Sequence, residues 1–295
     1  MNGIMCRYYI LKKYLTQIPS TVLDENKITD DIIFKYADFL STPLFYRRNF
    51  IKDKYKIYDK MNGDNFNSFF IETLISASKM VTRSEEFPYD VLIFMYALAL
   101  YHLEDEILIP YINQNKSTNT HNYEALNMLD YYYASKLENI DLKKTNLTLK
   151  YADGFTYTDE MDDLIHQPMV KCCRLLETKN YFLRAYKKKA HFYNYYTKSR
   201  FGLKKLYIAI YVKISQNMFR RHAFYHKEID TRLLNMSKQS FEIHGERLNY
   251  SLEEMINKYL FNKFLDYADS INEYLIDGKS RKIKKLLNIS SEKKM

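Results

Sequence analysis

The 295-residue sequence has no tryptophan, three cysteines, six glycines and five prolines. So few turn-forming residues disfavour a turn-rich β-sandwich and favour long helices. A lone Cys6 and the adjacent pair Cys172 and Cys173 form neither a disulfide framework nor a C-x-x-C ligand pair, which fits a reducing compartment. The sequence has no glycine-rich phosphate loop and no Gly-x-Ser-x-Gly motif, which disfavours nucleotide binding through such a loop and α/β-hydrolase chemistry.

Long apolar runs are also scarce. The longest, residues 91–103, is broken only by His102 and is shorter than the roughly 20 residues that a membrane span needs. The first turns of the chain contain Arg7, Lys12 and Lys13, so they lack the apolar centre of a secretory signal. These features predict a cytoplasmic protein.

Apolar residues recur at helical spacing along much of the sequence. They predict helices at residues 4–18, 32–36, 66–84, 89–109, 120–133, 162–190, 204–226 and 251–276. The helix at 89–109 is apolar nearly all round, which predicts a buried position, and Pro110 is expected to end it. Residues 37–46 are expected to be irregular, with Asp38 in a turn. No run alternates strongly enough to predict a sheet.

The sequence therefore predicts an all-α fold, with one helical domain over residues 1–277 built around the buried central helix at about 89–109. Ser251 followed by Glu254 is a capping signal for the last long helix. The tail, residues 278–295, is basic and is expected to be disordered.

Positive charge is concentrated in one stretch. The net charge is +9, and residues 166–221 contain 14 Lys and Arg against one acid, a local excess of 14 − 1 = +13. The predicted anion-binding residues are Lys187, Lys188, Lys189, Arg200, Lys204 and Lys205. The expected partner is an anionic phospholipid or membrane surface; nucleic acid is a less favoured partner, and a solvated basic face without a ligand is the alternative.

Two groups of residues have the spacing of metal ligands. His102 and Glu106 are four residues apart and flank Asp105, and His121 precedes Glu124 by three residues. Such spacings are common by chance. The order of the segments along the chain is further support for a metal site. The residues that define this order are 7–8, 37–39, 101–105, 109–111 and 120–124.

In that order, the sequence resembles the zinc-dependent phospholipase C-like family, particularly its cytoplasmic bacterial members. The resemblance implies catalytic and metal-binding roles for Asp38, Asp105 and Glu124. In such families, zinc ions held by histidines and carboxylates activate water for attack on a phosphodiester. His102 and His121 each lie one residue from a family histidine position and join the predicted metal ligands if the register is shifted. In the unshifted register, the family histidine positions are occupied here by Arg7, Asn62, Tyr101, Ile109 and Thr120.

Three interpretations of function remain open from the sequence. The first is a degenerate, non-catalytic family member in which Arg7 pairs with Asp38 or Glu124 in place of a metal. The second is an active metal-dependent phosphodiesterase or phospholipase, with zinc as its cofactor. The third is a basic helical protein that binds anionic membrane or nucleic acid. The substrate, the oligomeric state and the biological partner stay open.

Overall fold

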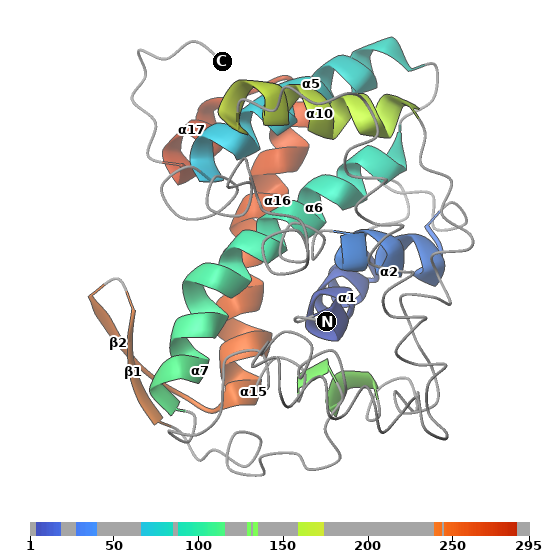
Figure 1. Cartoon of the computed structure of the whole chain (residues 1–295). Helices are drawn as coiled ribbons and strands as arrows, with labels where there is room; N and C mark the ends of the chain where they lie inside the picture. The colour runs from blue at the N-terminus through green and yellow to red at the C-terminus, as the bar shows by residue number, and fades with distance from the viewer. Residues whose placement is uncertain are drawn as a thin grey trace, which may run out of the picture.

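A long central helix organises the fold in this computed structural model (Figure 1). The structure describes residues 4–18, 28–39, 66–84, 88–115, 129–130, 132–134, 159–173, 239–243 and 245–287. Helix α6 (Tyr89–Leu103) is buried from Val91 to Leu103, which explains why its sequence is apolar on every side. The helices that pack against it are α1 (Ile4–Leu15), α2 (Asp30–Phe39), α5 (Phe66–Arg83) and α16 (Phe261–Leu275).

The central helix continues past its predicted end. After α6, a π-helical turn, η3 (Glu104–Leu108), leads directly into α7 (Ile109–Asn115), which contains Pro110. Proline inside a helix lacks an N–H group and collides with the carbonyl four residues earlier, and a widened turn directly before it relieves that collision. The boundary predicted at Pro110 is therefore wrong, whereas the burial of the helix is confirmed.

The other predicted helices are confirmed where the structure describes them. Helix α10 (Asp159–Cys173) packs on α5, and the residues described between 129 and 134 are helical. Asp38 lies inside α2, so the turn predicted around it is wrong. Residues 204–226 lie outside the described ranges. No helix in those ranges is both long and apolar enough to cross a bilayer.

The all-α class is confirmed, with one small β-hairpin that the sequence did not predict. Strands β1 (Gln239–Ile243) and β2 (Glu246–Tyr250) pair antiparallel, with Gly245 in the turn at a φ of 80°. Phe241 is buried and lies edge-on to Tyr111 of α7, with ring centroids 5.3 Å apart. Polar and apolar residues do alternate in both strands on either side of Gly245, so the sequence carries a local hairpin signal.

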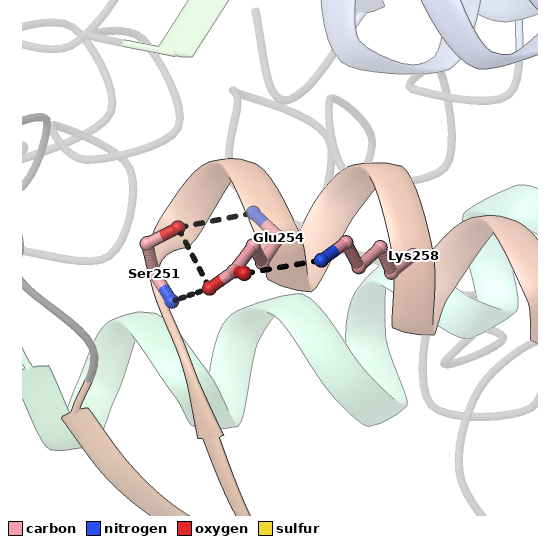
Figure 2. Close-up of polar contacts among 3 residues, drawn as sticks. All are labelled: Ser251, Glu254 and Lys258. Carbon is pink, nitrogen blue, oxygen red and sulfur yellow. Dashed lines mark hydrogen bonds and ion pairs between the residues drawn. The ribbon is translucent and has the colours of Figure 1, made fainter.

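The last long helix begins at the predicted capping signal (Figure 2). The Glu254 N–H donates to Ser251 Oγ at 3.2 Å, and the Ser251 N–H donates to Glu254 Oε2 at 3.1 Å. This reciprocal capping box satisfies two backbone donors at the start of α15 (Leu252–Glu254), which continues through η4 (Met255–Leu260) into α16. Lys258 adds an ion pair to Glu254 at 3.1 Å.

The C-terminal tail contains a helix where its composition predicts disorder. The turn at Gly278, with a φ of 68°, ends α16, and residues Arg281–Leu286 then form helix α17. Ile283 and Leu287 are buried, and α17 packs on α16. Disorder from residue 278 is therefore wrong for residues up to 287, because these two apolar side chains dock the segment. Residues 288–295 lie outside the described ranges.

A polar bridge joins three helices inside the core. The Tyr96 hydroxyl donates to Asn272 Oδ1 at 2.5 Å, and Asn272 Nδ2 donates to the Tyr14 hydroxyl at 3.2 Å. The bridge therefore connects α6, α16 and α1. Buried polar groups of this kind favour one packing arrangement, because any shift would leave them without partners.

The capping box gives a stability prediction. We expect Ser251→Ala to lower the free energy of unfolding by about 1 kcal/mol, because it leaves the backbone N–H of Glu254 without its acceptor. Ser280→Ala is the matched control, since Ser280 stands at the N-cap of α17 and makes no side-chain capping bond. Urea unfolding of both variants measures the difference, and equal losses would contradict the prediction.

Candidate functional site

Arg7 is the centre of a buried polar cluster at the junction of α1, α2 and the central helix. Its side chain is 1% exposed, and Nη1 forms an ion pair with Oε2 of Glu104, the first residue of the π-helical turn. Its Nε donates to the Ala37 carbonyl at 3.0 Å, and its Cζ lies 5.5 Å from the centre of the Tyr101 ring. Ala37 is in the last turn of α2, where carbonyls lack helical partners, so Arg7 also caps that helix.

Asp130 is a second buried charge in the same cluster. Its side chain is 0% exposed, and Oδ1 accepts the backbone N–H of Met5 at 2.8 Å. Met5 lies in the first turn of α1, where N–H groups have no partner within the helix and the helix dipole favours an anion. Asp130 therefore caps α1 from a segment far along the chain.

The cluster holds more negative than positive charge. Burial, together with Asp130 and Asp105, raises the pKa of Glu104 to about 8, although Arg7 opposes the shift. Burial also raises the pKa of both Asp105 and Asp130 to about 6. The pKa of the Cys6 thiol is likewise raised, first by burial and then by Glu104 and Asp130.

Two carboxylate oxygens in the cluster have no hydrogen-bond partner within the described part of the chain. They are Oε1 of Glu104 and Oδ2 of Asp130. A buried ionised oxygen without a partner is costly, and a carboxyl group in that position favours its protonated form. Because Arg7 supplies one positive charge against these acids, the neutral form of at least one carboxyl group reduces the imbalance.

His102 lies on the other side of the central helix. Its ring stacks on Phe66 of α5, with centroids 3.6 Å apart and planes 2° apart, and Nε2 lies 3.2 Å from Glu106 Oε1. Its ring also meets the edge of Tyr267 of α16 at 6.1 Å. Residues two apart on a helix point in nearly opposite directions, so His102 and Glu104 contact different neighbours.

The structure brings together only part of the predicted catalytic and metal-binding set. Asp38 is buried one residue after Ala37, and Asp105 follows Glu104, so both belong to segments that meet at Arg7. His102 is turned toward α5 and α16. Glu124 and His121 lie outside the described residues. Among the residues described, no group of three or more His, Cys, Asp or Glu side chains is arranged to hold a metal ion.

The predicted anion-binding stretch lies wholly outside the described residues. That set comprises Lys187, Lys188, Lys189, Arg200, Lys204 and Lys205. Its role in contacting a membrane surface or a nucleic acid therefore stays a prediction.

Sequence reasoning assigned no site role to Glu104 or Asp130. Glu104 stands in the acidic run at the end of the apolar helix, and that position was its only available signal. No local pattern marks Asp130, because the N–H group it binds belongs to Met5, 125 residues earlier.

Comparison of the chain with models of known protein families, with curated proteins and with solved structures finds no match. The resemblance to the phospholipase C-like family therefore stays a prediction.

The buried ion pair gives a second stability prediction. We expect Arg7→Met to lower the free energy of unfolding by about 3–5 kcal/mol at about pH 9, above the pKa of Glu104, because it leaves the buried carboxylates without their cation. Lys12→Met on the same helix is the control. It removes an ion pair to Asp30 that is open to solvent and should cost less than about 1 kcal/mol.

Placing Arg7→Met in a Glu104→Gln background tests the cause. The loss should shrink there, because the carboxylate that needs the cation is gone. An unchanged loss would show that Arg7 acts through packing alone.

The raised pKa values predict how stability depends on pH. Glu104 has a folded pKa of about 8 against an ordinary 4.5, and Asp105 and Asp130 have about 6 against 3.8, so the native state keeps protons that the unfolded chain releases. This contribution is complete below the unfolded pKa values and is lost as the pH rises through the folded ones. We expect the free energy of unfolding to fall from about pH 5 to about pH 8, by up to about 1.4 kcal/mol per pH unit for each proton.

Urea unfolding across this range measures the slope. In Glu104→Gln the part of the fall above about pH 6 should disappear, because the carboxyl group that titrates there is removed. A free energy of unfolding that rises with pH in the unmodified protein would contradict the assignment.

Proposed function

We propose that this chain is a non-catalytic relative of the zinc-dependent phospholipase C-like family, in which a buried ion pair takes the place that the family gives to metal. Arg7 stands where the resemblance puts a histidine ligand. The observation that carries the proposal is the ion pair of its buried guanidinium with Glu104, next to the predicted ligand Asp105.

The donor set of the described cluster does not fit zinc. Zinc in proteins is held mainly by imidazole nitrogen and thiolate sulfur, with carboxylate as an addition. The cluster offers the carboxylates of Glu104, Asp105 and Asp130 and the Cys6 thiol, whose raised pKa keeps it protonated, while Arg7 places a fixed positive charge among them. A guanidinium cannot be deprotonated to act as a ligand, and its charge repels a second cation. We therefore assign no reaction step to this cluster.

Its role in the proposal is to hold helices together. Arg7 neutralises part of the acidic cluster and caps α2, and Asp130 caps α1. In a metalloenzyme of the resembled type, a bound metal would supply the positive charge that such acids require. In this chain Arg7 supplies that positive charge, and the helical fold is kept without metal-dependent hydrolysis.

Metal analysis tests the proposal. Protein purified after growth with added zinc should contain much less than one zinc per chain and should not hydrolyse bis(p-nitrophenyl) phosphate, a simple phosphodiester. The measurements are elemental analysis by mass spectrometry and release of p-nitrophenol. Asp105→Ala should leave both readings unchanged.

The opposite result would identify the active alternative. One zinc or more per chain, lost together with phosphodiester hydrolysis in Asp105→Ala, would contradict the proposal. Asp266→Ala is the control for unspecific loss, because Asp266 is an exposed carboxylate on α16.

A further inference from the structure

Helix α17 presents a dense positive face. Ile283 and Leu287 are buried against the protein, whereas Arg281, Lys282 and Lys285 are exposed. At about 100° per residue, these cations and the half-buried Lys284 cover roughly 160° of the helix, opposite the buried side chains. Lys279, which is also exposed, lies just before the helix. We call Lys279, Arg281, Lys284 and Lys285 the α17 basic face. The name leaves out Lys282, which forms an ion pair with Glu273.

Contacts with α16 and α5 fix the backbone of helix α17 and of the turn before it. Lys282 Nζ forms an ion pair with Glu273 Oε2 of α16 at 2.8 Å, and Asn67 Nδ2 of α5 donates to the Leu287 carbonyl at 3.3 Å. The Lys279 N–H donates to the Glu273 carbonyl at 3.0 Å, which fixes the turn before α17. A partner would therefore bind cations whose backbone is already ordered, so binding would cost little conformational entropy.

Most of this positive charge is not neutralised by nearby acids. The described residues provide ion pairs for Lys282 and, at 3.5 Å, for Lys279 with Asp277, but none for Arg281, Lys284 or Lys285. Arg281 is three residues from Lys284 and four from Lys285, and like charges at these spacings each destabilise a helix by a few tenths of a kcal/mol. An external anion would remove that repulsion.

An apolar side chain favours one kind of anion. Ile276, which precedes the turn into α17, is 52% exposed and is one of the two large hydrophobic residues exposed in the described ranges. Ile276 stands three residues before Lys279, and cations close in sequence to an exposed aliphatic residue suit the headgroup region of a bilayer, where charge and apolar contact act together. Residues 276–287 contain no aromatic residue on which a nucleic-acid base could stack.

The geometry points to the α17 basic face, with Ile276, as a docking surface for anionic phospholipid bilayers. Binding comes from phosphate and carboxylate groups of the headgroups near the four cations, with Ile276 entering the interfacial layer. This surface is separate from the buried cluster around Arg7 and does not depend on whether that cluster binds metal.

Sedimentation of the full chain with vesicles tests this surface. We expect binding to phosphatidylcholine vesicles that contain about 30% phosphatidylserine, and little binding to phosphatidylcholine alone. Added salt should weaken the binding, because it screens exposed charges. The triple variant R281Q/K284Q/K285Q should bind about 100-fold more weakly, at about fivefold for each charge removed.

Two further variants separate the contributions. K79Q/R83Q/K263Q removes one arginine and two lysines that are exposed on α5 and α16 rather than on α17, and should weaken binding by less than about threefold. Ile276→Ser keeps every charge and should weaken binding by about threefold. Thermal unfolding of each variant checks that it remains folded.

Several outcomes would overturn the assignment. Equal losses in the two triple variants would show that overall charge, rather than α17, drives binding. Equal binding to vesicles with and without phosphatidylserine would remove the role of the cations. Binding to single-stranded RNA that R281Q/K284Q/K285Q abolishes, with vesicle binding unaffected, would reassign the α17 basic face to nucleic acid.

Discussion

The buried ion pair between Arg7 and Glu104 is the interaction on which the packing around the central helix depends. Apolar burial holds α6 in place, but burial alone does not specify how α1 and α2 meet its C-terminal end. A guanidinium without access to water needs its acceptor oxygens in fixed positions, and that requirement fixes the approach of the helices that carry them.

Helix ends and side-chain charges are combined in this cluster. The free carbonyls at the end of α2 meet Arg7, and the free N–H groups at the start of α1 meet Asp130. Each helix terminus thus contributes a partial charge opposite to that of the side chain it contacts. Like a metal ion, the Arg7 guanidinium is a single positive charge with several oxygen atoms around it. Unlike a metal ion, it is part of the chain.

The helices could be predicted from sequence because their signals are local. The apolar spacing in α1 and α6 and the Ser251–Glu254 capping box each lie within a few turns. The cluster could not be predicted in the same way. The π-helical turn that begins at Glu104, the partner of Arg7, has no signal in the sequence. Asp130 reaches α1 only through tertiary structure, and Pro110 continues a helix that its local preference would end.

The long-range partners of α1 have a consequence for the order in which the protein folds. Helix α1 takes its cap from Asp130 and a core hydrogen bond from Asn272, which are 125 and 258 residues away from their partners. Neither group exists while α1 is being made, so the cap forms only after Asp130 has been made and the bond to Tyr14 only after Asn272 has been made. Closing contacts across such sequence distances slows folding and prolongs the exposure of apolar surface. The contacts of helix α1 are thus complete only when residues as late as Asn272 are in place.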